Sequence, residues 1–348
     1  MRDNGSTAPA SSAPGSTSGR RAAPPARFPA LPTASAVFAV LFALTFFASS
    51  YHLFQLTMLV VYAVAVLGMV ILTGYNGQIS LGHGAFFAIG SYATAILMAN
   101  YDWPYWATIP VAAAASALLG FLIGFPALRL GGLYLALTTF ALAVAVPQVL
   151  KVDALSNLTG GVQGLTMDKP DAPFGLPLSG DQWIYLFTLL VGAAMFLLGW
   201  NLTRGRIGRA MLAVREQSTA AEAMGVGLAA LKTRTFAVSA MFTGIAGALS
   251  SIAVQFVAPD SFNFFLSITL FVGLVVGGVD SIPGALFGGA FVEFVPNIAN
   301  DLSKAAPGAI YGAILIGFMF VMPRGVGGAL GTLIRRWRRG RAKVVAAE

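Results

Sequence analysis

Two polar side chains near the start of an apolar stretch have the types and spacing of a catalytic pair. Ser80 and His83 are three residues apart, so a helix would place them on the same face. A serine beside a histidine can act as a nucleophile, which would make the chain an intramembrane hydrolase. No acidic residue lies nearby in the sequence, and the other histidine, His52, lies at the edge of an apolar segment. We therefore expect His83 to form hydrogen bonds within a helix bundle.

The motifs of several enzyme classes are missing. The sequence contains neither the G-x-x-x-x-G-K-[ST] loop that binds nucleotide phosphates nor an H-E-x-x-H zinc motif. It contains no cysteine, which excludes disulfides and thiolate metal sites. We therefore expect no catalytic residue, no metal site and no cofactor.

The composition is that of a protein whose solvent is lipid. Apolar residues make up 57% of the 348 residues and charged residues only 10%, whereas soluble domains carry about 25% charged residues. These proportions exclude a soluble enzyme and a disordered scaffold. The net charge of +8 does not indicate nucleic acid, because the basic residues lie where membrane topology would place them.

Ten apolar segments approach the length that crosses a bilayer, which is about 20 residues. We therefore expect an all-α polytopic membrane protein with about ten transmembrane helices. The last three segments are short and interrupted by glycine and proline, so their ends are poorly defined. The predicted spans are residues 33–50, 53–73, 78–99, 104–125, 131–150, 182–202, 235–257, 264–279, 284–299 and 308–323.

Lysine and arginine set the predicted orientation. With the amino terminus inside, ten spans place 18 of the 21 basic residues on the inner side, in agreement with the positive-inside rule. Lys151, Lys169 and Lys304 fall outside. We expect both termini and residues 203–234 in the cytoplasm of a bacterium, residues 151–181 outside, and the chain in the inner membrane.

The two ends of the chain differ from the apolar region between them. Residues 1–32 are mostly small residues and proline, which cannot bury enough surface to fold. We expect a disordered cytoplasmic tail there, with a cleaved signal peptide ending near Ser49 as the alternative. Residues 33–325 form the predicted transmembrane domain. Residues 326–348 form a basic cytoplasmic tail, whose charges suit anionic membrane lipid.

Polar side chains and glycine are concentrated at the start of the third predicted span. Asn76, Gln78, Ser80 and His83 alternate with glycines in residues 74–92. Such a segment is costly in lipid unless it faces protein or a water-filled path. We interpret it as a broken helix that lines a pathway, with a tightly packed helix crossing as the alternative.

The inner loop contains a predicted surface helix. Residues 210–224 are strong helix formers and Gly225 supplies a helix stop. This helix would either dock a cytoplasmic partner or lie on lipid headgroups. Its predicted apolar face consists of Ala220, Ala221, Ala223 and Met224.

Carboxylates are scarce in the predicted spans. Asp280 lies at a glycine–proline break, and Glu293 lies in the outer half of the ninth span. A carrier coupled to protons or sodium normally places carboxylates at mid-depth. The sequence therefore favours an energy source outside this chain.

Several segments resemble one family of membrane proteins, the branched-chain amino-acid ABC importer permeases of the LivM type. The similar segments are residues 74–92, 131–139, 158–165, 208–225, 232–249 and 277–289, in the family's order. The resemblance implies a second, related permease chain, two cytoplasmic ATPase subunits and a soluble substrate-binding protein outside. It also implies that the helix around residues 215–224 couples the permease to the ATPase.

The resemblance and the residue pattern together give two sets of candidate residues. The predicted coupling residues are Arg215, Glu216, Ala220, Ala221, Glu222 and Gly225. The predicted pathway residues are Asn76, Gln78, Ser80, His83 and Tyr92. Branched-chain or other hydrophobic amino acids are the expected substrates. Urea or short amides, or an ATP-independent channel, are the alternatives.

Glycines spaced four residues apart predict close helix contacts, because each pair leaves a flat stripe on one helix face. The four pairs are Gly120 and Gly124, Gly273 and Gly277, Gly284 and Gly288, and Gly308 and Gly312.

Overall fold

The computed structural model describes residues 30–127, 132–173, 177–302, 304, 306–322 and 325–329. Helices dominate this part of the chain, which confirms the all-α membrane fold. One exception within it is an antiparallel pair of two-residue strands, β1 (Leu165–Thr166) and β2 (Phe256–Val257). The predicted tails lie mostly outside the described residues, although α1 already begins at Ala30, inside the tail predicted at 1–32.

Each of the ten predicted spans contains a helix. The helices of the first half are α1 (Ala30–Phe47), α2 (Ser50–Met69), the π-helix η1 (Val70–Tyr75), α3 (His83–Tyr101), α4 (Tyr105–Ala127), α5 (Leu133–Leu150) and α6 (Asp153–Thr159). Those of the second half are α7 (Gly180–Arg204), α8 (Arg206–Glu216), α9 (Ser218–Ala223), α10 (Leu228–Val254), the short 3-10 helix η3 (Pro259–Phe262), α11 (Phe264–Gly277), α12 (Gly284–Leu302) and α13 (Pro307–Val321).

The helices differ in whether they could cross a membrane alone. Within the described residues, four are long and apolar enough: Ser50–Tyr75, Tyr105–Phe125, Gly180–Arg204 and Leu228–Val254. The pair α5 and α6, bent by 80°, would make a fifth. Helix α11 has 14 residues and is about 21 Å long, shorter than the ~30 Å hydrocarbon core. It therefore spans only part of the bilayer.

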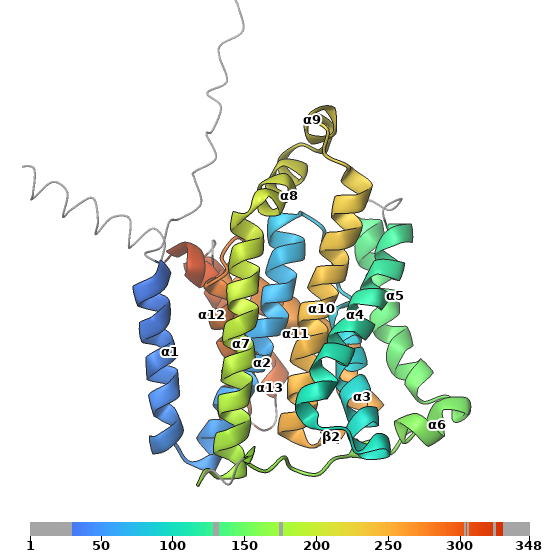
Figure 1. The fold of residues 1–348 in the computed structure, drawn as a ribbon. Helices are drawn as coiled ribbons and strands as arrows, with labels where there is room; N and C mark the ends of the chain where they lie inside the picture. The colour runs from blue at the N-terminus through green and yellow to red at the C-terminus, as the bar shows by residue number, and fades with distance from the viewer. Residues whose placement is uncertain are drawn as a thin grey trace, which may run out of the picture.

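The connections between helices gather on two opposite faces of the molecule (Figure 1). Helices α8 and α9 form one face, where the described part of α1 also begins. Helix α6 and strand β2 lie at the other face. We call these the α8–α9 face and the α6 face. The two long loops predicted on opposite sides of the membrane do lie on opposite faces.

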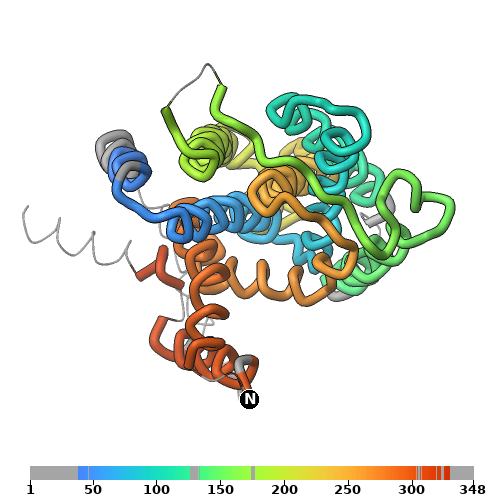
Figure 2. The backbone as a smooth tube through the Cα atoms, turned by 90° about the horizontal axis from the view of Figure 1, so that it is seen from below, coloured from blue at the N-terminus to red at the C-terminus, as the bar shows by residue number. Residues whose placement is uncertain are grey.

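Helices α2 and α10 form the centre of the bundle (Figure 2). In each, 78% of the most apolar stretch is buried, compared with 33% in α4 and 39% in α7. Most of the side chains left exposed on α4 and α7 are apolar, including Phe121, Leu122 and Leu197. These outer helices therefore present lipid-facing surfaces, while α2 and α10 hold the elements around them.

Glycines allow α3 and α10 to cross with their backbones in contact. Gly90 lies against the backbone of Gly244, and Gly247 lies against the backbone of Phe87. The hydroxyl of Ser91 donates a 2.7 Å hydrogen bond to the carbonyl oxygen of Gly247. A side chain at either crossing glycine would push the two helices apart.

Three of the four predicted glycine pairs make the expected close contacts. Gly120 and Gly124 pack on α10, and the pairs in α11 and α12 face each other, Gly277 against Gly284 and Gly273 against Gly288. For the pair in α13 the prediction is untested, because no described atom outside the helix itself comes within 4 Å of a Cβ built at Gly308 or Gly312. Helix α13 packs on α12 through aromatic rings, and the ring centroids of Phe318 and Phe291 lie 5.8 Å apart.

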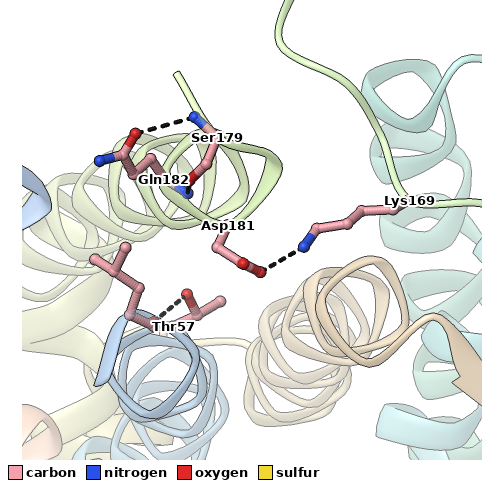
Figure 3. A network of polar contacts seen from close by, with 6 residues as sticks. Thr57, Lys169, Ser179, Asp181 and Gln182 are labelled. Atoms are coloured by element: carbon pink, nitrogen blue, oxygen red, sulfur yellow. Dashed lines mark hydrogen bonds and ion pairs between the residues drawn. The ribbon is translucent and has the colours of Figure 1, made fainter. Parts of the chain in front are cut away.

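The loop on the α6 face is fixed by polar contacts at the start of α7 (Figure 3). Lys169 and Asp181 form an ion pair of 2.6 Å. Ser179 and Gln182 cap the helix reciprocally, since the Ser179 hydroxyl accepts from the Gln182 N–H at 3.3 Å and the Gln182 side chain accepts from the Ser179 N–H at 3.0 Å.

Candidate functional site

The polar segment identified in the sequence is a break between two helices. Helix α2 widens into η1, and residues 76–82 that follow are not helical. Gly77 has a φ of +71°, a conformation that glycine adopts at little cost. The predicted interruption of the helix is present as a non-helical connection between η1 and α3, and its role in lining a pathway stays a prediction. The predicted start of the third span at residue 78 was wrong, because α3 begins at His83.

Backbone groups in this break find partners inside the protein. The hydroxyl of Thr73 donates to the carbonyl oxygen of Gln78 at 2.9 Å, and the N–H of Leu81 donates to the hydroxyl of Thr139 at 3.0 Å. The Gln78 amide donates to the carbonyl oxygen of Lys232 on α10 at 3.2 Å. These bonds explain how an irregular backbone is tolerated at this depth.

His83 is fully buried and bonds to α10. Its Nε2 lies 2.8 Å from the hydroxyl oxygen of Ser239, and that hydroxyl donates its single proton to the carbonyl oxygen of Gly68 at 2.7 Å. The Nε2 of His83 must therefore carry the proton of the first bond. This chain of bonds ties α3, α10 and α2 together, as expected for a histidine in a helix bundle.

The predicted serine–histidine pair does not form a catalytic arrangement. The hydroxyl of Ser80 accepts from the N–H of Gly82 at 3.3 Å, whereas His83 bonds to Ser239. In the described residues, no cluster of three or more His, Asp or Glu side chains could hold a metal ion. The arrangement can position polar groups, and nothing in it resembles a nucleophile with its base and orienting acid.

Asn76 is the candidate residue with the clearest unmet bonding capacity. It is 2% exposed, and neither side-chain atom has a hydrogen-bond partner among the described residues. Leaving a buried amide unpaired costs about 1–3 kcal/mol. An unpaired amide at a helix break is suited to bond with a permeating solute or with water in another conformation.

Tyr92 does not belong to the same cluster. It lies nine residues after His83 on α3, which corresponds to about 13 Å along the helix, towards the α6 face. Its ring packs against Phe262 with centroids 6.0 Å apart, and its buried hydroxyl has no partner in the described residues. The predicted pathway residues therefore form one group around the break and one separate tyrosine.

The surface helix predicted at residues 210–224 is two helices. Gln217 separates α8 from α9 with an extended backbone, φ −155° and ψ 97°. Met211 and Val214 anchor α8 by burial, so this helix packs on the bundle. Gly225 has a φ of +86° and follows the end of α9, which confirms the predicted helix stop.

Arg215 connects the surface helices to two breaks in the membrane part. Its guanidinium donates to the carbonyl oxygen of Gly74 in η1 and forms an ion pair with Asp280 between α11 and α12. Its side chain also covers Gly77. Sequence reasoning missed Asp280 as a partner, because the two residues are 65 positions apart. The only available signal was an acidic residue at a glycine–proline break.

The exposed residues of α9 differ from the predicted apolar face. Ala220, Ala223 and Met224 are exposed, with Met224 85% exposed. Ala221 is only 5% exposed, so the prediction that its side chain belongs to the docking face was wrong. Its carbonyl oxygen accepts from the N–H of Val226 at 3.0 Å, a bond that closes the C-terminal end of α9. Glu216 and Glu222 are exposed.

Apolar outer helices around a buried helical core define the class of the protein as a polytopic membrane protein. The chain belongs to the family described as "Branched-chain amino acid transport system / permease component", whose model matches residues 51–323.

Individual relatives agree with this assignment. The chain is 30% identical over 296 residues to the high-affinity branched-chain amino acid transport system permease protein LivM of Salmonella typhimurium, covering 78% of this chain and 68% of that protein. It is 23% identical to the corresponding permease protein LivH of Escherichia coli K12, covering 76% and 90%. Permease protein BraD of Pseudomonas aeruginosa is 26% identical, covering 72% and 88%. No solved structure matches the chain.

Proposed function

We propose that this chain is the permease subunit of an ATP-driven importer that carries branched-chain and other hydrophobic amino acids into the bacterial cytoplasm. The observation that supports this most directly is Arg215, which joins the surface helix α8 to both helix breaks of the membrane part. The relatives described above are named as permeases of branched-chain amino acid transport systems. Membership of the family supports the same kind of cargo here.

The energy source in this proposal is a pair of separate ATPase subunits that dock on the α8–α9 face. The chain itself lacks a phosphate-binding loop. The side chains of Ala223 and Met224 are exposed on this face, and burying a methionine side chain stabilises a contact by about 1.5–3 kcal/mol. The acidic groups of Glu216 and Glu222 are exposed beside them and would pair with basic residues at the edge of the ATPase contact.

The orientation proposed here places the α8–α9 face and both termini in the cytoplasm. Arg204, Arg206 and Arg209 lie at this face, where the positive-inside rule expects them. The α6 face, with Lys169 paired to Asp181, then receives the soluble substrate-binding protein. Similarity to both LivM and LivH, each a named permease protein of Salmonella typhimurium, supports a pathway formed by two related permease chains.

Arg215 suggests how docking would reach the pathway. A movement of α8 would pull on the Gly74 carbonyl and on Asp280 together, because one guanidinium holds both. Gly74 leads directly into the break that holds Asn76, Gln78, Ser80 and His83. We assign these four residues to the inner gate of the path.

The test is uptake by the complete importer in liposomes. The chain is co-produced with its partner permease and ATPase subunits, and binding protein is added outside. We expect uptake of labelled leucine that requires ATP hydrolysis, with a non-hydrolysable ATP analogue as the matched control. Uptake of urea but not leucine would favour the importer of urea or short amides. Solute flux through the chain alone, without ATP, would favour a channel.

A further inference from the structure

A cavity of about 440 Å³, open to the molecular surface where Tyr51 and Phe54 are exposed, lies between α2, α11 and α12, apart from the helix break and the surface helices. Its residues on α2 begin at Tyr51, in the first turn of that helix, so it lies in the half of the bundle towards the α6 face. Its volume is within the range of small-molecule sites, ~300–1,000 Å³. Its polar lining consists of Tyr51, Gln55, Tyr62, Thr269, Glu293 and Asn297.

Glu293 brings a carboxylate into this cavity without a counter-charge from the chain. Within the described residues, its carboxylate accepts a hydrogen bond from the amide of Asn297 at 3.4 Å. The ion pairs of the described residues all lie elsewhere, joining Lys151 to Asp260, Lys169 to Asp181 and Arg215 to Asp280. An ionisable side chain within a membrane span is costly and generally marks a functional site.

Several donors around Glu293 are already used, and its carboxylate remains an acceptor, while the hydroxyls of Tyr51 and Tyr62 each keep a proton to donate. The Thr269 hydroxyl donates to the carbonyl oxygen of Phe265 at 2.9 Å. The Asn297 amide donates to the carbonyl oxygen of Glu293 at 2.8 Å, and the Gln55 amide donates to the hydroxyl of Tyr51 at 3.0 Å. A cavity that offers a carboxylate and amide oxygens binds a ligand that brings N–H donors and positive charge.

The remaining wall of the cavity is apolar. Phe54 and Met58 line it from α2, Leu266 from α11 and Val292 from α12. An aliphatic chain would be buried against these side chains. The cavity therefore matches a molecule with an ammonium group and an apolar group.

We propose that this cavity is an outer binding station of the transport path, in which Glu293 binds the ammonium group of the permeating amino acid. This inference rests on the proposed function and adds a site for the cargo. The shape and charge of the station favour an amine over a free carboxylate. A basic side chain of the partner permease paired with Glu293 is the competing occupant.

The test uses a cysteine placed in the cavity wall. Because the chain has no cysteine of its own, a thiol reagent can label it only at the introduced position. Thr269→Cys is introduced into the complete importer and labelled with a small thiol reagent. Protection by three compounds is compared: leucine, 3-methylbutylamine, which lacks the carboxylate, and 4-methylpentanoate, which lacks the ammonium group. We expect leucine and the amine to slow labelling, and the acid to have no effect.

Glu293→Gln in the same background removes only the charge. We expect it to raise the half-protecting concentration of the amine by about tenfold or more, the scale of a lost charge-assisted hydrogen bond. Asp301→Asn is the matched control, because Asp301 is an exposed carboxylate on the same helix. It should leave protection unchanged.

Three outcomes overturn the station: equal protection by the acid, protection by the amine that survives Glu293→Gln, or no protection by any compound. Loss of the partner permease on purification of Glu293→Gln, without protection, would assign Glu293 to the subunit contact. Leucine uptake is measured in the same vesicles. Uptake without protection rejects the station alone, and protection by the amine without uptake rejects the proposed function alone.

Discussion

Replacing Gly90 with alanine should destabilise the bundle, and the structure gives the size of the effect. The new methyl group would meet the carbonyl oxygen, the carbonyl carbon and the Cα of Gly244, well inside van der Waals contact. These are backbone atoms, so no side chain can rotate away. Helices α3 and α10 would have to separate by roughly 1–1.5 Å to restore a normal contact distance.

Two costs follow from that separation. Forcing an extra carbon into a packed contact costs about 1–3 kcal/mol. The same movement stretches the 2.8 Å bond between His83 and Ser239 and the 2.7 Å bond from Ser91 to Gly247 beyond hydrogen-bond range. Each such bond contributes about 1 kcal/mol. We therefore expect the free energy of unfolding to fall by about 3–5 kcal/mol.

The assay is thermal stability of the full chain in detergent, followed by the fraction that remains monodisperse after heating. Gly312→Ala is the matched control, because a Cβ there meets no described atom within 4 Å. In a helix, alanine is ordinarily more stable than glycine by about 0.5–1 kcal/mol. Alanine should therefore lower the stability of the protein at position 90 and raise it at position 312. A Gly90→Ala protein as stable as Gly312→Ala would refute the backbone contact.

Three further predictions test the proposed function. A cysteine at Ser218 on α9 should react with an impermeant thiol reagent only after the membrane is opened, and labelling in intact cells would refute the orientation. The double change Gln78→Leu and His83→Leu removes the bonds to Lys232 and Ser239, so leucine uptake should fall at least about tenfold while the subunits still co-purify. Unchanged uptake would show that the break serves packing only. Ala223→Asp should release the ATPase subunits on co-purification, because an unpaired charge buried in the contact costs several kcal/mol, and retained subunits with normal coupled hydrolysis would place the docking contact elsewhere.

The helix positions could be predicted because long apolar runs are a local property of the sequence. The bounds of α4, α7 and α11 lie within a few residues of the predicted spans. Gly225 was a reliable stop because the φ of +86° that it adopts favours glycine. The third span began too early, because residues 78–82 are held by hydrogen bonds to α5 and α10 that no local pattern specifies.

The contacts that define the candidate site depended on tertiary structure. Ala220 and Ala221 are neighbouring alanines that the sequence does not distinguish, yet Ala221 is buried in the folded chain and Ala220 is exposed. The partners of His83 and Arg215 are 156 and 65 positions away in the sequence. Periodicity could place such residues on a helix but could not identify what they touch.

The π-helix η1 allows this part of the chain to absorb a change of length. A π-helix bonds each residue to the fifth along instead of the fourth, so it holds one more residue than an α-helical turn would. Deleting a single residue within Val70–Tyr75 would close the π-helix to an α-helical turn and leave the following backbone close to its present orientation. Deleting a residue from the α-helical part of α2 would instead rotate the following backbone by about 100° and turn the Gly74 carbonyl away from Arg215. Single-residue deletions should therefore be selected against more strongly in Ser50–Met69 than in Val70–Tyr75 during evolution.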